Sequence, residues 1–174
     1  MYIVTVVLLI VTIAALIGID QAVKYWAVES LQPKGSIDFI HFGDFEIFDL
    51  TYLENDGAIF GSMSGQRWFL IGFTSLVIIA VTVFLFMQRK RSKVLNTALL
   101  LFIAGGIGNL IDRIRFGYVV DMFEFKPFEF AIFNVADIYV TFAVIILIVY
   151  VMFIDPAIEK KTKAAAAEKA EHNE

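Results

Sequence analysis

The sequence predicts a mainly α-helical membrane protein with four transmembrane helices and a small β element outside the membrane. Of its 174 residues, 59% are hydrophobic and 18% are charged, whereas a soluble domain is about half apolar and about a quarter charged. The apolar residues gather into runs close to the 20 or so helical residues that cross a hydrocarbon core of about 30 Å. An alternating stretch rich in aromatic residues indicates the β element.

Four apolar runs form the predicted spans, at about residues 3–19, 68–87, 94–111 and 135–154. The first run also has the position and length of a cleaved signal peptide. It has no basic region and no convincing small-residue cleavage site, and polar residues begin at Asp20, so we favour a retained helix. A single membrane-embedded domain over residues 1–154 follows, with a charged tail at 155–174.

Basic residues in the short loops predict the orientation. Arg89, Lys90, Arg91 and Lys93 lie between the second and third runs, and such residues concentrate on the cytoplasmic side of a membrane. With four spans, both termini and the tail are then cytoplasmic. The outer segments are those at residues 20–67 and 112–133.

A small β element is predicted in these outer segments. Residues 45–54 alternate with a period of two and are rich in aromatic side chains, which is typical of a strand. A similar stretch covers residues 118–125, and after a Lys126-Pro127 break another covers 128–133. Neither face is purely polar, as expected for strands that lie against lipid or cover a site. The pattern leaves the pairing of the strands undecided.

Two aspartates carry the main functional interpretation. Asp121 lies in a strand-like run and Asp137 lies at the start of the fourth span, and acids at a bilayer edge are candidates for function. Asp137 also suits the first turn of a helix capped by Asn134, and Asp121 suits an ordinary outward-facing strand position. Since both approach the membrane from one side, we interpret them as a carboxylate pair able to hydrolyse an amide bond with water.

Other polar residues flank this pair. Asn109, Asp112 and Arg113 share one helical face, and Arg113 either pairs with an acid or extends to the lipid headgroups. Asp20 and Lys24, four residues apart, most simply form a surface ion pair.

Asn55 lies in a stretch of turn-forming residues over 54–61. Its side chain offers both a donor and an acceptor, which suits binding of a peptide backbone. A plain loop is the alternative interpretation.

Several kinds of site are excluded or disfavoured by the composition. Cysteine is absent, which excludes disulfides and thiolate sites. With two histidines and no metal motif, no metal or cofactor is expected. The net charge of −4 gives no support to nucleic-acid binding. Met63 occupies the serine position of a nucleophile elbow, while a Ser–Lys pair using Lys24 or Lys34 stays open because nothing selects its partners.

Two other classes of protein compete with a hydrolase. Acids at membrane boundaries also relay protons in transporters, and aromatic strands can hold a partner in a scaffold protein. The acids cluster at one face and no inverted internal repeat is evident, which disfavours a proton-coupled transporter.

Five short motifs follow one another along the chain. They are Asp20-Gln21-x-x-Lys24, Asn55-x-Gly57-Ala58-x-Phe60, Gly106-x-Gly108-Asn109-Leu110-Ile111-Asp112-Arg113, Val119-Val120-Asp121 and Phe133-Asn134-x-Ala136-Asp137. In this order they resemble the motifs of lipoprotein signal peptidase, also called signal peptidase II. Ile59 stands where that family usually has a small residue, and Met122 stands where Phe is common. Both are apolar, so the departures affect the shape of a pocket more than its chemistry.

The resemblance implies a bacterial intramembrane aspartyl endopeptidase that removes signal peptides from prolipoproteins, cutting before a cysteine that carries a diacylglyceryl group. Asp121 and Asp137 would be the catalytic pair, with acid and base unassigned. The residues implied to line or brace the substrate site are Asp20, Lys24, Asn55, Gly57, Asn109, Arg113, Asn134 and Ala136.

The resemblance also implies a β-cradle and a short loop helix in the first outer segment, with part of the cradle coming from the second. In the family, the substrate site also accepts the cyclic peptide globomycin. We expect a monomer in the bacterial cytoplasmic (inner) membrane, with membrane lipid as a partner and the active site near the outer face.

Overall fold

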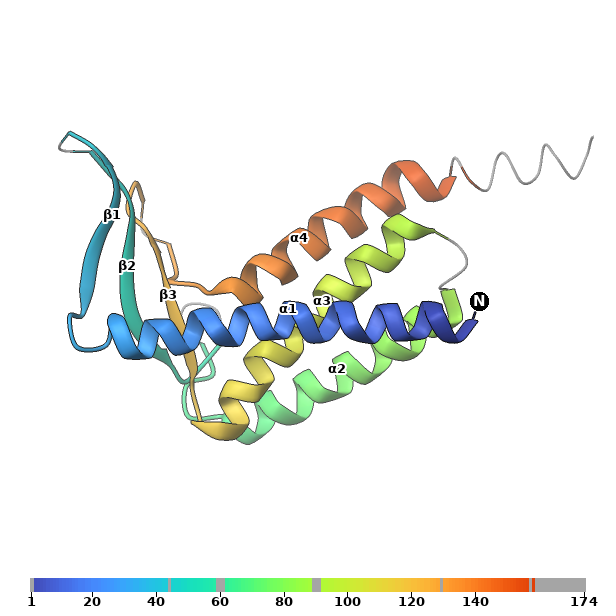
Figure 1. Cartoon of the computed structure of the whole chain (residues 1–174), viewed down its shortest axis with the longest axis horizontal. Coiled ribbons are helices and arrows are strands. Elements are labelled where there is room, and N and C mark those ends of the chain that lie inside the picture. The colour runs from blue at the N-terminus through green and yellow to red at the C-terminus, as the bar shows by residue number, and fades with distance from the viewer. Residues whose placement is uncertain are drawn as a thin grey trace, which may run out of the picture.

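The computed structural model describes residues 2–43, 45–58, 62–88, 92–128, 130–156 and 158. Within these residues, four long helices form a bundle, and a three-stranded sheet lies at the end of the bundle opposite to the N-terminus (Figure 1). The helices are α1 (Tyr2–Ser30), α2 (Arg67–Gln88), α3 (Lys93–Arg115) and α4 (Val135–Val149), and α4 continues into a π-helical turn, η2 (Tyr150–Ile154). The strands are β1 (Ser36–Phe42), β2 (Phe45–Asn55) and β3 (Val119–Phe125).

The four predicted spans are confirmed. Each helix is long and apolar enough to cross a membrane, and the candidate spans are Val4–Ser30, Arg67–Gln88, Lys93–Arg115 and Val135–Ile154. The first helix ends at Ser30, well beyond the predicted end near residue 19, and α3 ends at Arg115 instead of near 111. Helix α1 continues because Asp20 and Lys24 find buried partners within the bundle, so the end of the apolar run does not end the helix.

Helix α3 is the centre of the bundle. In its most apolar stretch of 18 residues, 44% of the residues are buried, against 6% in the corresponding stretch of α1 and 11% in those of α2 and α4. Helix α3 also packs against all three other helices. Apolar side chains on the outside of the bundle are exposed, among them Leu8, Phe73, Ile79 and Phe142. This is the surface expected of helices that are apolar all round and face lipid.

Two apolar clusters hold the fold together. One joins α2, α3 and η2 through Ile78, Leu85, Leu95, Leu99, Ile103 and Tyr150. The other joins the end of α1 to the sheet through Ala27, Leu31, Leu50, Val120 and Met122. The second cluster fixes β3 against α1, and so places Asp121, which lies between Val120 and Met122, next to the bundle.

The sheet has the order β1-β2-β3 and is antiparallel throughout. The predicted stretches at 45–54 and 118–125 correspond to β2 and β3. The pattern did not predict β1, and the described residues among 128–133 contribute only an isolated bridge from Phe133 to Phe123. In the register of β2 and β3, Leu53 lies opposite Asp121 and Asn55 lies opposite Val119.

Some expectations fall on parts of the chain that the structure does not describe. Of the first outer segment, residues 44 and 59–61 lie outside the described residues, and Ile59 is among them. The described residues between α1 and α2 form strands and turns, so the loop helix implied by the resemblance is not found in them. Residues 159–174 of the charged tail likewise lie outside the description.

Candidate active site

The structure brings Asp121 and Asp137 to one cavity of about 490 Å³. Asp121 is buried on β3, and Asp137 lies in the first turn of α4. The predicted residues Asn55, Asn109 and Arg113 line the same cavity. Segments far apart in the sequence therefore converge on the two aspartates, which we call the aspartate pair.

Asn134 connects the two members of the aspartate pair. Its Nδ2 donates to Asp121 Oδ1 at 2.6 Å, and its Oδ1 accepts from the backbone N–H of Asp137 at 3.0 Å. The Asp137 carboxylate accepts in return from the N–H of Asn134 at 3.1 Å, which completes a capping box at the start of α4. Asn134 is therefore a helix cap, as predicted, and also a bridge between the two carboxylates.

Two further asparagines each bind one carboxylate. Asn55 Nδ2 donates to Asp121 Oδ2 at 2.9 Å, and Asn109 Nδ2 donates to Asp137 Oδ1 at 2.8 Å. Asn134 also donates to Asn109 Oδ1 at 3.1 Å. Both carboxylates are thus fixed by neutral amide donors, which orient them without neutralising them.

Asp121 holds its proton more tightly than an exposed aspartate does. Burial is the main cause that raises its pKa to about 7, and the charge of Asp137 raises the pKa further. The hydrogen bonds from Asn55 and Asn134 act in the opposite direction. Near neutral pH, Asp121 is therefore partly protonated and able to donate a proton.

Arg113 points inward. Its Nη2 donates to the carbonyl oxygen of Gly57 at 2.7 Å, and its Nε is buried with no hydrogen-bond partner. The alternative in which Arg113 extends to the headgroups is therefore wrong. Asp112, one of its expected partners, binds Lys24 instead, at 2.9 Å.

Asp20 and Lys24 form the predicted ion pair, but the prediction that this pair lies at the surface is wrong. Lys24 Nζ lies 3.1 Å from Asp20 Oδ2, and the two side chains are 4% and 0% exposed. The pair is buried because α1 extends past both residues and packs against α3. With Nζ held by two carboxylates and Asn109, Lys24 is poorly suited to act as the base of a Ser–Lys pair.

Five of the predicted site residues support the cavity without lining it. Gly57 binds Arg113 through its carbonyl and donates its N–H to Asn55 Oδ1 at 3.0 Å. Ala136 is fully buried and donates its N–H to Asp20 Oδ1 at 2.9 Å. Asn134 binds the aspartate pair as described above. The residues in this group are Asp20, Lys24, Gly57, Asn134 and Ala136.

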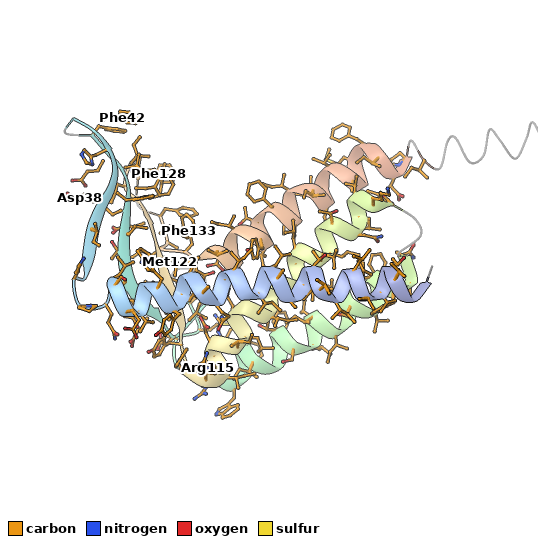
Figure 2. The ribbon with its side chains drawn as sticks, in the orientation of Figure 1. Asp38, Phe42, Arg115, Met122, Phe128 and Phe133 are labelled. Atoms are coloured by element: carbon orange, nitrogen blue, oxygen red, sulfur yellow. The ribbon has the colours of Figure 1, made fainter. Side chains whose placement is uncertain are left out.

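The sequence did not reveal the apolar wall of the cavity. On α4 this wall consists of Ile138, Val140, Thr141 and Phe142, and opposite them lie Val119 and residues 130–133. Figure 2 shows Phe133 and Phe128 on the side of the sheet that faces α4, and Asp38 on the other side. The spacing of 138, 141 and 142 places them on one helical face together with Asp137. That spacing could have indicated the wall from the sequence. It did not single these residues out, because most residues of a membrane span are equally apolar.

No group of three or more His, Cys, Asp or Glu residues suited to a metal ion is found among the described residues. The polar part of the cavity instead presents two carboxylates, amide groups and one guanidinium. Such a set can activate water and bind a peptide backbone.

Comparisons with known proteins agree with these features. Residues 12–153 match the family described as Signal peptidase (SPase) II. The lipoprotein signal peptidase of Streptococcus thermophilus is 46% identical over 138 residues, which are 79% of this chain and 88% of the relative. That of Streptococcus pyogenes serotype M6 is 40% identical over 142 residues, or 82% of this chain and 91% of the relative.

The fold is shared with a solved structure described as a bacterial membrane enzyme, determined by the in meso method at 2.3 Å resolution. Its TM-score is 0.74 at 29% sequence identity, over 83% of this chain and 87% of that chain. The resemblance that the five motifs predicted is thus confirmed over most of the sequence, and the chain belongs to the signal peptidase II family of membrane proteases.

Proposed function

We propose that this protein removes signal peptides from prolipoproteins, with Asp121 and Asp137 as its catalytic pair. The observation that carries this proposal is the bridge through Asn134, which holds both carboxylates at one cavity. The relatives named lipoprotein signal peptidase support the substrate class. The family match gives no support to the proton-coupled transporter that acids at a membrane boundary also suggested.

In the proposed reaction, Asp137 is the base and Asp121 is the acid. Asp137 lies at the N-terminus of α4, where the helix dipole favours a negative charge, so its carboxylate takes a proton from water as that water attacks the scissile carbonyl carbon. Asp121, whose pKa is raised to about 7 by burial, donates a hydrogen bond to the carbonyl oxygen as this oxygen gains charge. The proton on the pair then passes to the departing amine when the C–N bond breaks.

The donors around the aspartate pair are suited to orient a peptide. Arg113 lines the cavity, and its guanidinium has N–H groups besides the one that binds Gly57, from which a substrate carbonyl would accept. Asn55 lines the same cavity from the end of β2. We propose that Arg113 and Asn55 hold the backbone on either side of the scissile bond.

The apolar wall is suited to the lipid part of the substrate. Ile138, Thr141 and Phe142 continue the cavity along α4 away from Asp137, and Phe142 is 55% exposed on the outside of the bundle. A diacylglyceryl group lying there would stay in the hydrocarbon, where each buried methylene contributes about 0.8 kcal/mol. The lipid would then supply much of the binding, and the amide donors would need to recognise only the peptide backbone.

We further propose a single domain over residues 1–154 in the bacterial cytoplasmic (inner) membrane, with both termini and the tail in the cytoplasm. The basic residues between α2 and α3 support this orientation. The sheet lies at the end of the bundle away from the N-terminus (Figure 1), so the cavity would open near the outer face. One chain supplies every polar group named above, which supports a monomer, and globomycin-type cyclic peptides would compete for the same cavity.

The test is cleavage by the purified protein in detergent. A precursor peptide whose cysteine carries a diacylglyceryl group should yield two products, and the same peptide with an unmodified cysteine should be cleaved far more slowly. Asp137→Asn preserves the size of the side chain but removes the ionisable group, so it should abolish cleavage while the protein stays folded. A folded wild-type protein that leaves the lipidated precursor intact contradicts the proposal, as does near-normal turnover by Asp137→Asn.

A further inference from the structure

A buried lysine lies between two carboxylates that take no part in the proposed reaction. Lys24 Nζ is 3.1 Å from Asp20 Oδ2 and 2.9 Å from Asp112 Oδ2, and it also donates to Asn109 Oδ1 at 2.9 Å. The side chains of Asp20, Lys24 and Asp112 are at most 4% exposed. Charged groups this deeply buried are retained only with close partners, so the three form one unit.

Each of the two carboxylates also accepts a backbone N–H from another element. Asp112 Oδ2 accepts the N–H of Val120 at 3.3 Å, and Asp20 Oδ1 accepts the N–H of Ala136 at 2.9 Å. Val120 directly precedes Asp121 on β3, and Ala136 directly precedes Asp137 on α4. The backbone amide next to Asp121 is therefore bound by Asp112, and the backbone amide next to Asp137 is bound by Asp20. Both carboxylates belong to the same buried unit.

Gln21 and Gly108 complete the unit. Gln21 Nε2 donates to Asp112 Oδ1 at 2.9 Å and to Asp20 Oδ2 at 3.2 Å, which links the two carboxylates a second time. A Cβ at Gly108 would lie 2.5 Å from Asp20 Oδ2, so a glycine is needed here for α1 and α3 to approach. The contacts of the unit thus join α1, α3, β3 and α4.

We propose that Asp20, Lys24 and Asp112 form an amide clamp that positions the two catalytic carboxylates relative to each other. The inference rests on the proposed function and extends it. None of the three residues lines the cavity, so they act through the backbone at Val120 and Ala136 and through the side chain of Asn109, and they are positioning residues. This assigns to Asp20 and Lys24 a different role from the substrate contact that the resemblance alone suggested.

The first test uses Asp112→Asn and Asp20→Asn, which keep the size of each side chain and remove its charge. Displacement of a reacting group by about 1 Å lowers turnover by about 100-fold, so a smaller shift should lower kcat about 10- to 100-fold and leave KM nearly unchanged. The kcat is expressed per binding-competent site, counted with a non-cleavable lipidated peptide. A merely structural role would reduce the number of sites and leave kcat per site at the wild-type value, which would overturn the clamp.

The double variant tests whether the two carboxylates act as one unit. Because both bind Lys24, the loss of kcat per site in Asp20→Asn/Asp112→Asn should be smaller than the product of the two single losses. A loss equal to that product would mean two independent supports and would overturn the shared clamp.

A second perturbation leaves every charge in place. Gly108→Ala should displace Asp20 by steric contact and lower kcat per site in the same way, so it decides the matter if Asp112→Asn does not fold. Asp49→Asn is the matched control, since Asp49 is also buried and paired with a lysine, Lys126, at 3.3 Å. It contacts neither Val120 nor Ala136 in any described interaction, and should leave kcat per site unchanged.

The outcomes separate this inference from the proposed function. If the folded wild-type protein does not cleave the lipidated precursor, the proposed function itself fails. If the wild type cleaves and Asp112→Asn retains wild-type kcat per site, the clamp alone fails; where Asp112→Asn does not fold, the same result with Gly108→Ala has that meaning.

Discussion

Replacement of Asn134 by serine tests the assignment of Asp121 as the acid. The Asn134 side chain caps α4 through its oxygen and donates to Asp121 Oδ1 through its nitrogen at 2.6 Å. Serine is an equally good capping residue, but its shorter side chain lacks the amide that donates to Asp121. The change therefore removes the bridge between the two aspartates and keeps the start of the helix.

The size and sign of the effect follow from that one hydrogen bond. A hydrogen bond to a charged group contributes about 1.5–3 kcal/mol, and one pKa unit corresponds to about 1.4 kcal/mol. In the wild type this bond lowers the pKa of Asp121, which burial raises to about 7. Its loss should raise that pKa by about one unit, after allowing for water that replaces part of the bond.

The measurement is the pH dependence of kcat/KM, which reports the ionisation of the free enzyme. If Asp121 acts as the acid, activity should fall above about pH 7 in the wild type. In Asn134→Ser this fall should move about one pH unit higher, together with a lower maximum because the pair is less well aligned.

Asn134→Ala is the matched control, because it loses the cap as well as the bridge. It should show the same displacement of the pH profile and a further loss of stability of about 1 kcal/mol. A folded Asn134→Ser variant whose activity falls at the wild-type pH would refute the assignment of Asp121.

Three further predictions concern other parts of the molecule. Arg113→Lys should lower kcat/KM about tenfold or more, because an ammonium cannot bind Gly57 and a substrate together as the guanidinium fork can; an unchanged value would remove Arg113 from the site. Gly105→Ala should lower the melting temperature in detergent, corresponding to about 1–3 kcal/mol, because a Cβ there meets the carbonyl oxygen of Ala136; a stability equal to wild type would show that α3 and α4 can separate freely. The pKa of Asp121 is raised in the folded state, so its contribution to stability is full below pH 3.8 and is lost as the pH rises towards about 7. Relative to Asp121→Asn, the wild type should therefore lose melting temperature over this range, and parallel curves would contradict it.

The number and approximate positions of the spans could be predicted because they depend on length and polarity alone. Four apolar runs of sufficient length gave the four helices, and period-two stretches gave β2 and β3. The end of α1 could not be predicted, since Asp20 and Lys24 end the apolar run although the helix continues to Ser30. Partners distant in sequence make their burial favourable, namely Asp112 and Asn109 for Lys24 and the N–H of Ala136 for Asp20.

The aspartates were found because an acid at the edge of a membrane is unusual by itself. Their neighbours were harder to predict, since the position of Asn134 as a cap gave no sign that its nitrogen binds Asp121. The apolar wall was missed for the opposite reason, as Ile138 and Phe142 look like any other residues of a span. Strand β1 was missed because its mostly exposed residues are ordered by pairing with β2 and not by a buried face.

The spacing of Asp20 and Lys24 on one helix has a consequence for biogenesis. Opposite charges one turn apart can neutralise each other within a single helix, so α1 can enter the lipid during synthesis before any other span is present. Asp112, by contrast, finds Lys24 only after α3 has inserted and docked on α1. On this order of insertion, β3 and α4 can be drawn together only after α3 has docked on α1, and the active site is complete only once α4, which carries Asp137, has inserted as well.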